Sequence, residues 1–214
     1  MNIIQKIYKY FLKKVYKHIR LLLIKHFGIG RPKTKDKWNE EYSKGKWDYL
    51  LSHRIDEKNK LITDMIFANS ENPNILDVGC GNGALIQMIF EKDFNYYLGV
   101  DRSDIAIAQF NEKLKKVSNI ELIASEIDKV NFKHKFDCVI FNEVLYYLNR
   151  PINTLRKILN YVNENSIIIV SMTVNENNEK IWNKLSKNIS EVNRFKVKTS
   201  DNSMCRISIY ETLS

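Results

Sequence analysis

The stretch that most constrains what this chain can fold into is ILDVGCGNG, residues 75–83. An apolar, β-prone run leads directly into three glycines within five residues, Gly79, Gly81 and Gly83. Because glycine has no Cβ, it permits positive φ angles and lets a ligand approach the main chain closely. The pattern predicts a strand, a tight turn and the start of a helix, as at the ligand-binding end of a doubly wound α/β domain.

The glycines alone leave the ligand open, because the spacing Gly79, Gly81, Ala84 also satisfies a loose dinucleotide fingerprint. Asp77 narrows the choice. Its carboxylate, two residues before the first glycine, would repel a pyrophosphate but attract a cationic ligand that carries an amino group. A tight turn that binds no ligand is the alternative interpretation.

ILDVGCGNG resembles the first motif of class I S-adenosylmethionine-dependent methyltransferases. The acidic second motif of that family is matched by Asp101, which ends the strand predicted for residues 96–101 and lies 24 residues after Asp77. At about this interval a carboxylate meets the ribose of a nucleotide across the sheet edge. The resemblance implies that Asp101, which Arg102 follows, accepts hydrogen bonds from both ribose hydroxyls. A helix N-cap acid is the alternative role for Asp101.

Two further motifs of the family follow in order. After the strand predicted for residues 120–124, the family carries an acid that accepts from the adenine amino group and an apolar residue that packs on the ring. Glu126, one methylene longer than the usual aspartate, and Ile127 stand there, with an exposed loop acid as the alternative role for Glu126. FDCVIFNEVLYYL resembles the fourth motif, whose strand end flanks the transferred methyl group. The resemblance therefore implies a cofactor site made of Asp77, Gly79, Gly81, Gly83, Asp101, Arg102, Glu126, Ile127 and Asn142.

The predicted elements alternate between strands and helices, which defines an α/β fold class. The fourth and fifth strands are predicted over 136–141 and 166–172, and a hairpin at 200–203 separates two closing strands. We expect a doubly wound, Rossmann-like sheet of seven mostly parallel strands with an antiparallel last strand. Helices are predicted over 56–69, from the glycine turn to about 91, from the Ser103 N-cap to 116, from Pro151, and over 176–189. The predicted units are a basic helix with a hinge (1–30), a helical lid (31–70) and the Rossmann-like domain (71–214).

The net charge of +9 is located at the start of the chain. Residues 1–37 hold eleven Lys or Arg against one acid, which is +10, and the remainder holds 23 against 24, which is −1. Residues 2–27 contain no Pro or Gly, and lysines interrupt every apolar run, which disfavours a transmembrane span or a signal peptide. A helical wheel places Ile4, Ile7, Tyr8, Phe11, Leu12, Val15, Ile19, Leu22 and Leu23 on one side, and Lys6, Lys9, Lys13, Lys17 and Arg20 on the other.

Three interpretations of this basic amphipathic helix remain open. It can lie in the interface of an anionic membrane, where each Lys or Arg adds about 1 kcal/mol of attraction. It can instead pack its apolar face on its own domain or on a partner subunit. Tyr8, Tyr10 and Tyr16 also permit an RNA-binding arm.

The passage WNEEYSKGKWDYL, residues 38–50, is similar to the lead-in of many small class I methyltransferases, especially those that resemble sugar- and polysaccharide-modifying enzymes. The resemblance implies that this segment caps the cofactor cleft. Aromatic residues at such density suit a lid that stacks on a ligand and excludes water. The alternative is a helix that two tryptophans dock onto the core.

The catalytic residues are not identified by any diagnostic pattern. Methyl transfer needs mainly positioning, and a hydroxyl acceptor additionally needs a base. The candidates near the fourth strand end are Glu143, Tyr146 and Tyr147, with His53 and His134 as more remote ones. A lone His or Tyr more often has a structural role. Cys80, Cys138 and Cys205 are far apart and form no metal motif, which favours a reducing, cytoplasmic compartment and predicts no metal.

We therefore expect an enzyme that transfers a methyl group from S-adenosylmethionine to a small-molecule or glycan or lipid-linked acceptor, at the inner membrane face through its first helix. The family signature for methylation of nucleobases, Asn or Asp followed by Pro-Pro-Tyr or Pro-Pro-Phe, is absent after the fourth strand, which disfavours nucleic acid as a partner. The alternatives are an RNA methyltransferase that uses the basic arm and a non-catalytic module that binds a membrane or a partner.

Overall fold

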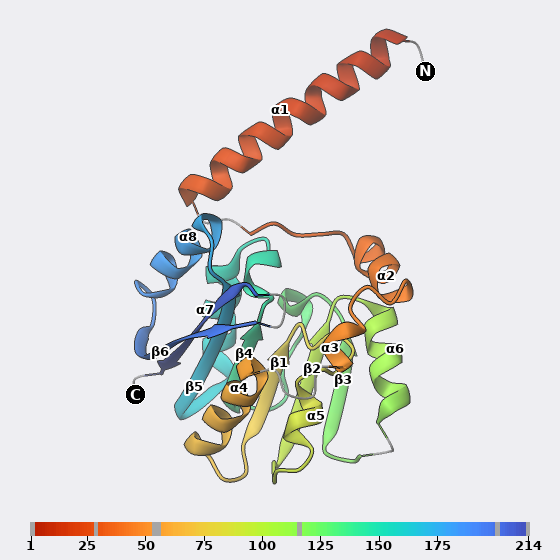
Figure 1. Cartoon of the computed structure of the whole chain (residues 1–214). Coiled ribbons are helices and arrows are strands. Elements are labelled where there is room, and N and C mark those ends of the chain that lie inside the picture. Colours follow the sequence, from red (N-terminus) through yellow and green to blue (C-terminus); the bar gives the residue numbers. More distant parts are fainter. Residues whose placement is uncertain (1–2, 28–29, 53–56, 115–116, 200–201, 213–214) are drawn as a thin grey trace.

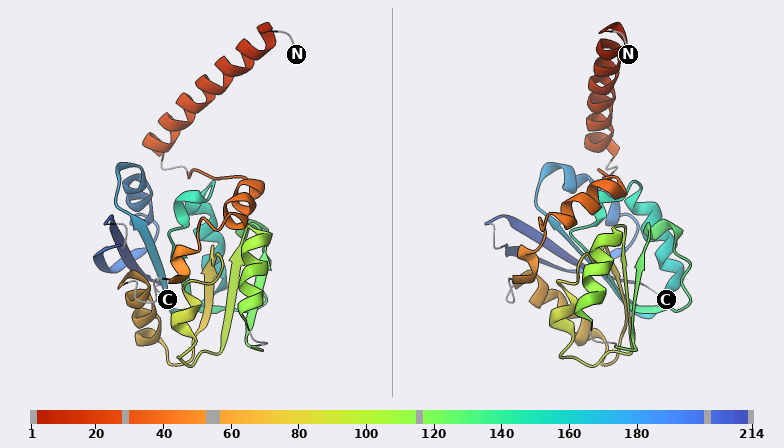
Figure 2. Two further views of the ribbon diagram at one scale, coloured as in Figure 1. Left: turned by 45° about the vertical axis from the view of Figure 1, so that its right-hand side comes forward. Right: turned by 90° about the vertical axis from the view of Figure 1, so that its right-hand side faces the viewer.

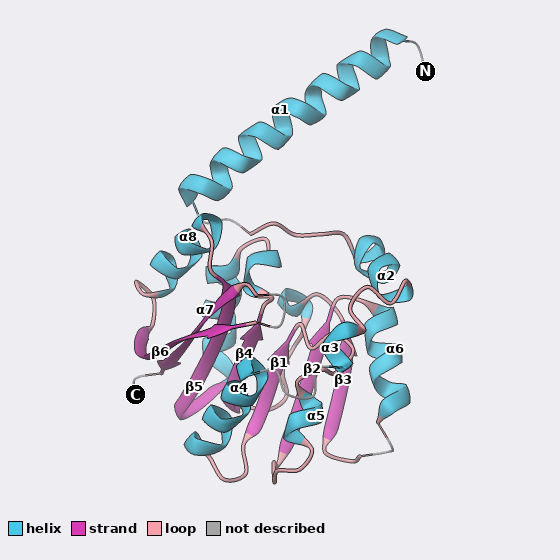
Figure 3. Cartoon of the chain, viewed as in Figure 1, coloured by secondary structure: helices cyan, strands magenta, loops and turns pink. Residues whose placement is uncertain are grey.

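The computed structural model describes the chain except for residues 1–2, 28–29, 53–56, 115–116, 200–201 and 213–214 (Figure 1). Within the described residues, seven strands form one sheet in the order β3-β2-β1-β4-β5-β7-β6 (Figure 3). The strands β1 to β5 pair in parallel, and β7 runs antiparallel to both of its neighbours. The predicted fold class is confirmed. The strands are β1 (Asn74–Val78), β2 (Tyr96–Asp101), β3 (Ile120–Ala124), β4 (Phe136–Asn142), β5 (Val162–Thr173), β6 (Ser190–Lys198) and β7 (Met204–Glu211).

Helices cover both faces of the sheet (Figure 2). Because side chains alternate along a strand, each strand supplies two cores. Leu76 and Val78 of β1 enter the core with α7 and α8, whereas Ile75 enters the core with α4, α5 and α6. The helices are α1 (Ile3–Phe27), α2 (Lys35–Ser43), α3 (Tyr49–Ser52), α4 (Glu57–Asn69), α5 (Ile86–Ile89), α6 (Asp104–Lys113), α7 (Pro151–Ile158) and α8 (Glu176–Leu185).

Two predicted helix starts are confirmed. The Ser103 hydroxyl accepts a hydrogen bond from the Ala106 N–H at 3.1 Å and caps α6, and Pro151 occupies the first turn of α7. A side chain that accepts from an orphan N–H, or a proline that has no N–H to satisfy, lowers the cost of starting a helix. These local signals act before any tertiary contact, which explains why they could be predicted.

Three helices are shorter than predicted. After Gly83 the chain forms turns, and α5 begins only at Ile86 because Leu85 offers no side-chain cap. The helix after Ser103 ends at Lys113, since Leu114 is already extended. The helix predicted over 176–189 ends at Leu185, where the Asn188 side chain donates to the Lys184 carbonyl at 2.7 Å and closes the last turn.

The strand order reverses at β1, which pairs with β2 on one side and with β4 on the other. Such a reversal leaves a crevice at the carboxyl ends of the strands, because the connections depart in opposite directions. The glycine turn follows β1 at this edge, Asp101 ends β2 and Asn142 ends β4. The topology therefore brings three of the predicted motifs to one place.

The helix α1 extends away from the domain and contacts it through α8 (Figures 1 and 2). Its bounds confirm the helix predicted over residues 2–27. Among the residues that the structure describes, none of the helices combines the length and the hydropathy needed to cross a membrane.

Candidate functional site

The glycine turn is tied to the neighbouring strand by its main chain. The N–H groups of Gly79 and Cys80 both donate to the Val100 carbonyl of β2, at 2.7 and 3.2 Å. Gly79, Gly81 and Gly83 have φ angles of 74°, 56° and 87°. These values lie in the left-handed region, which glycine occupies without strain. The three glycines therefore form the tight turn that their spacing predicted.

Gly79→Ala is expected to lower the free energy of unfolding by about 2 kcal/mol or more, through strain at positive φ and through contact. A Cβ at this position would lie 2.4 Å from a methyl carbon of Val144. Denaturant unfolding measures the change. Gly45→Ala is the control, because its φ of 65° is also positive but its nearest neighbour is the mobile end of the Asp48 side chain. Equal losses in both variants would contradict a packing requirement at Gly79.

Asp101 is held by the same turn. Its carboxylate accepts hydrogen bonds from the N–H groups of Gly81, at 3.0 Å, and Ser103, at 2.8 Å. Burial raises the pKa of Asp101 to about 6, although these main-chain hydrogen bonds oppose the shift. The carboxylate therefore has a fixed orientation, and it is ionised above about pH 6. Ser103, and not Asp101, provides the side-chain cap of α6.

Asp77 lies deeper, with 2% of its surface exposed. The Tyr97 hydroxyl donates to its carboxylate at 2.6 Å. Burial raises the pKa of Asp77 to about 7, and the nearby charge of Asp101 adds to the shift. A carboxylate that is costly to ionise in the free protein gains from a cationic ligand, which fits the role inferred for Asp77 from its position.

Asp77→Asn is expected to stabilise the protein by about 2 kcal/mol at pH 8, with the gain disappearing toward pH 4. The folded-state pKa of about 7 lies above the ordinary value of 3.8. Protonation therefore favours the folded state, and the stability contributed by this proton is lost as the pH rises to about 7. Urea unfolding from pH 4 to 8 measures the difference in stability between variant and parent. The exposed Asp64→Asn serves as the control, and a gap independent of pH would contradict the assignment.

Glu126, the acid of the third motif, already has a partner within the protein. Glu126 lines the cavity together with Ile127, but its carboxylate accepts from the Arg102 guanidinium at 2.6 Å. Arg102 also donates to the Lys33 carbonyl at 2.8 Å. The Lys129 ammonium pairs with the other carboxylate oxygen at 3.4 Å, so both oxygens of Glu126 already have cationic partners. The predicted role of Glu126 toward an adenine amino group stays a prediction.

The end of β4 is a network of hydrogen bonds. Asn142 donates to the Asn59 side chain at 2.9 Å and accepts from Ser171 at 2.7 Å. Glu143, the next residue, has a φ of 56°, which is a strained conformation for a side chain of this size. Strain of this kind persists only where the surroundings fix it, and it concentrates at functional sites.

Glu143 is fixed by four donors. Its Oε2 accepts from the Tyr146 hydroxyl at 2.8 Å and from the N–H and hydroxyl of Thr173, both at 3.1 Å. Its Oε1 accepts from the Cys205 thiol at 3.1 Å. Glu143, Tyr146 and Tyr147 all line the cavity, so the structure brings these three catalytic candidates together.

The two histidine candidates fare differently. His134 precedes β4 and packs against Tyr96 with ring centroids 4.8 Å apart, which places it at the opposite edge of the sheet. The structure therefore does not bring His134 into the site. His53 lies outside the described residues.

Aromatic side chains of the segment between α1 and α4 line the mouth of the cavity. Trp38, Tyr42, Trp47 and Tyr49 contribute to it, and the Trp38 ring meets Tyr147 edge-on at 4.9 Å. The helix α2 also docks on α6. The segment thus lines the cavity and docks a helix on the domain, and its role as a lid stays a prediction.

A short strap crosses the same edge, where the sequence predicted a hinge up to residue 30 and a helical lid from residue 31 but no contact with the cavity. Residues 30–34 carry it, and the Arg31 N–H donates to the Tyr146 carbonyl at 2.7 Å. The Lys33 ammonium lies 4.2 Å from the Trp38 ring centroid and bonds to Glu41 at 2.8 Å. Gly30 packs so closely that a Cβ would lie 1.6 Å from the Leu148 carbonyl oxygen.

Lys58 and Asn59 are further cavity residues absent from the predicted site. Both are buried on α4, with 7% and 5% of their surface exposed. A signal was available, because they stand three to four residues before Ile62 on its inward helical face. Buried polar residues at such positions point toward a site.

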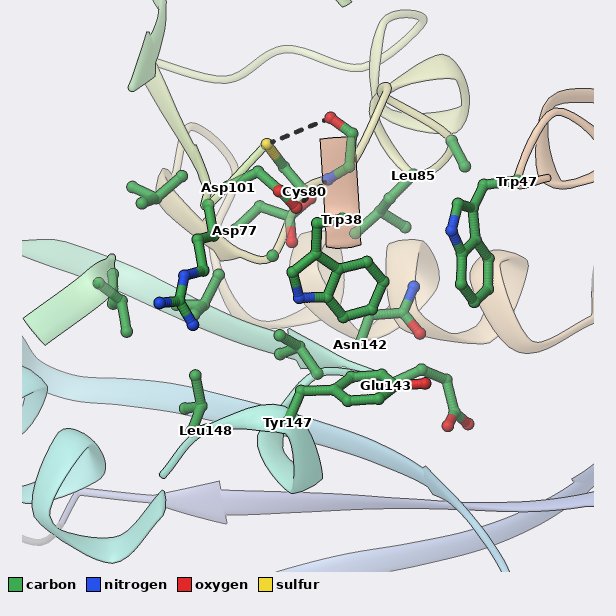
Figure 4. Close-up of a pocket in the computed structure, with 18 of the residues that line it drawn as sticks. Trp38, Trp47, Asp77, Cys80, Leu85, Asp101, Asn142, Glu143, Tyr147 and Leu148 are labelled. Atoms are coloured by element: carbon green, nitrogen blue, oxygen red, sulfur yellow. Dashed lines mark hydrogen bonds between the residues drawn. The ribbon is translucent and has the colours of Figure 1, made fainter. Parts of the chain in front are cut away.

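The cavity at the carboxyl edge measures about 270 Å³, close to the lower end of small-molecule sites. Figure 4 shows Asp77 and Asp101 on one side of it and Asn142, Glu143 and Tyr147 on the other, with Trp38 between them in this view. Two donors that line it, the Trp47 indole N–H and the Arg102 Nε–H, are buried and have no acceptor among the described residues. Orphaned donors, an oriented carboxylate and a turn that accepts only glycine fit a nucleoside ligand with hydroxyl and amino groups.

A doubly wound sheet with acidic residues near the carboxyl ends of its first two strands and a glycine turn at its switch point is typical of the class I S-adenosylmethionine-dependent methyltransferases. The sequence profile of a family described as methyltransferase domain matches residues 69–207, and the chain belongs to this family. Membership confirms the class that the motifs predicted and, with it, S-adenosylmethionine as the cofactor of the class.

Solved structures show the same fold at low identity. An N-methyltransferase from Bradyrhizobium japonicum WM9, in complex with S-adenosyl-L-homocysteine, has a TM-score of 0.66 at 17% identity, over 74% of this chain and 87% of that one. A magnesium protoporphyrin IX methyltransferase from Synechocystis PCC 6803, with S-adenosylmethionine bound, has a TM-score of 0.60 at 18% identity, over 76% and 80%.

Among curated proteins, tRNA U34 carboxymethyltransferases match this chain. The protein from Vibrio cholerae serotype O1 is 27% identical over 145 residues, which is 66% of this chain and 40% of that protein. The protein from Campylobacter fetus is 29% identical over 107 residues. The chain thus spans less than half the length of these relatives.

Proposed function

We propose that this protein transfers a methyl group from S-adenosylmethionine to a small-molecule or glycan or lipid-linked acceptor. The observation that carries the proposal is that two groups of residues line the same cavity. Asp77, the glycine turn and Asp101 form the first group. Glu143 and the aromatic residues of the segment between α1 and α4 form the second. A methyl donor and an acceptor could therefore lie side by side in one cavity, as in-line transfer requires.

The residues of the chain would act mainly by positioning. When bound, the cofactor supplies an electrophilic methyl group on a cationic sulfur. Asp101, oriented by two main-chain N–H groups, would accept from the ribose hydroxyls, and the orphaned Arg102 and Trp47 donors would find acceptors on a ligand. Trp38 and Tyr147, in edge-on contact, would exclude water from the transfer.

Glu143 is the best-placed proton acceptor on the acceptor side. The residue lines the cavity, and its carboxylate is held by Tyr146, Thr173 and Cys205. A hydroxyl or ammonium acceptor must lose a proton for methylation, and a fixed carboxylate next to it can accept that proton. Burial and the neighbouring Glu143 charge raise the pKa of Tyr146 well above its usual range, so this hydroxyl acts as a hydrogen-bond donor and not as a base.

An RNA acceptor is the second candidate, favoured by the names of the curated relatives. These names oppose the sequence-based expectation that nucleic acid is not a partner. The match spans 40% of the Vibrio protein, and aromatic residues of the segment between α1 and α4 line the cavity of this chain. An RNA substrate predicts labelled methyl in RNA and binding that weakens steeply with salt.

The deciding experiment combines cofactor titration with product fractionation. Calorimetry with S-adenosylmethionine tests whether the chain binds the cofactor, and absence of binding would overturn the proposal. Radiolabelled cofactor and fractionated cell extract then show whether label enters glycan, lipid, RNA or protein. Label in RNA alone would replace the first acceptor class by the second. Binding without label in any fraction would favour a non-catalytic module.

A further inference from the structure

The helix α1 has an apolar stripe that nothing in the described part of the chain covers. Every described side chain from residue 5 to residue 19 is exposed. The large apolar members of one helical side expose between 38% and 63% of their surface: Ile7, Phe11, Leu12, Val15, Ile19 and Leu22. A contiguous exposed stripe of this kind marks an interaction surface.

The opposite side of α1 is positively charged. Lys6, Lys9, Lys13 and Lys17 are exposed there, and α1 contains no acidic residue. With 25 residues, α1 is about 38 Å long, and its described side chains from residue 5 to residue 19 present both sides to solvent. The partner of α1 must therefore accept an apolar stripe and a row of cations at the same time.

Three possible partners of α1 do not accept both the apolar stripe and the row of cations. The domain itself contacts α1 through α8 and leaves the stripe exposed up to Leu22. A second copy of α1 could cover the stripe, but the lysines on the opposite sides of the pair would stay without an acid to pair with them. An RNA could neutralise the lysines, but the apolar stripe would stay in water.

We propose that α1 is a docking surface for an anionic lipid bilayer. Its apolar stripe enters the interface between headgroups and acyl chains, while its lysines meet anionic headgroups. Only this occupant buries Phe11 and its neighbours and neutralises Lys9 and its neighbours in one arrangement. The surface is formed by side chains that make no contribution to either core of the domain.

The docking surface is connected directly to the cavity. Two residues separate the end of α1, Phe27, from Gly30, where the strap begins. The strap is pinned at one end to the loop after β4, through the Arg31 N–H and the Tyr146 carbonyl, and at the other to Arg102 through the Lys33 carbonyl. A bilayer that holds α1 therefore holds the mouth of the cavity beside it. This part rests on the proposed function and indicates an acceptor presented by the bilayer, that is, a lipid-linked molecule.

The test uses the full chain in cosedimentation with vesicles of phosphatidylcholine, with and without phosphatidylglycerol, in the absence of cofactor. Phe11→Ser is expected to lower partitioning about tenfold, the loss of one buried aromatic side chain. Tyr10→Ser is the matched control, because Tyr10 is adjacent, aromatic and 70% exposed but points away from the stripe. Lys9→Gln with Lys13→Gln is expected to lower partitioning on the order of 30-fold on anionic vesicles alone.

Equal effects of Phe11→Ser and Tyr10→Ser would overturn the proposal, and so would equal binding to both vesicle types or binding to neither. If the protein binds RNA but not vesicles, and Phe11→Ser leaves RNA binding unchanged, α1 would be assigned to nucleic acid instead. Calorimetry with S-adenosylmethionine on the Phe11→Ser variant keeps the two proposals apart. If the protein binds vesicles but not the cofactor, the proposed docking surface stands and the proposed enzymatic function is overturned. Label confined to soluble products would remove the lipid-linked acceptor alone.

Discussion

Asp101→Ala is expected to weaken the binding of S-adenosylmethionine by about 100-fold or more, because each hydrogen bond from a ribose hydroxyl to a carboxylate contributes roughly 1.5 to 3 kcal/mol. The substitution also removes the hydrogen bond that the Gly81 N–H donates to the Asp101 carboxylate at 3.0 Å, so the glycine turn loses one of the contacts that hold it. Calorimetric titration at pH 8, where the carboxylate with its pKa of about 6 is ionised, measures the loss.

The pH dependence of parent binding gives a second readout. Ligand contacts to the ionised form should weaken as the pH falls through about 6. Asp104→Ala is the matched control, because Asp104 stands three residues away, pairs with Lys35 at the surface and does not line the cavity. Similar losses in both variants would show that the effect arises from α6 and not from a ribose contact.

Glu143→Gln is expected to lower the turnover of the preferred acceptor about 100-fold, since a positioned general base commonly contributes this much or more. The neutral amide cannot take up the proton that a hydroxyl or ammonium acceptor must release. Single-turnover rates with labelled cofactor, compared between parent and variant at one pH, measure the effect.

Two controls separate a catalytic from a structural role for Glu143. Tyr146→Phe removes one of its donors at 2.8 Å but keeps the carboxylate, so a smaller loss is expected. Cofactor binding and unfolding of Glu143→Gln should remain near those of the parent. A variant that turns over normally would show that the acceptor loses its proton to another group, and a variant that fails to bind cofactor would assign Glu143 to the architecture of the site.

Much of the fold could be predicted because its signals are local. The runs that became β1, β2, β3 and β4 are short, apolar and bounded by turn residues, and their predicted limits differ from the observed ones by at most one residue. The glycine turn was recognisable since positive φ angles demand glycine. Local caps such as Ser103 fixed where α6 begins, whereas helix ends without a cap, as in α5, were predicted too long.

Part of the candidate site could likewise be predicted from local signals, and part could not. Asp77, Asp101 and Asn142 could be placed because each stands at or next to the carboxyl end of a parallel strand, and these ends meet at one edge of the sheet. The ion pair that engages Glu126, the strained φ of Glu143 and the burial of Lys58 arise from contacts between residues far apart in the chain. No spacing rule reports such contacts.

The sequence by itself determined the class of this protein, since glycines at positive φ, strand-end carboxylates and alternating strands depend on backbone geometry that each residue type carries with it. Only the tertiary structure decided which side chains close the cavity, that residues 30–34 cross it as a strap, and that the stripe on α1 stays exposed. The reason is that burial and pairing are properties of two segments at once. The order of residues in either segment alone does not contain them.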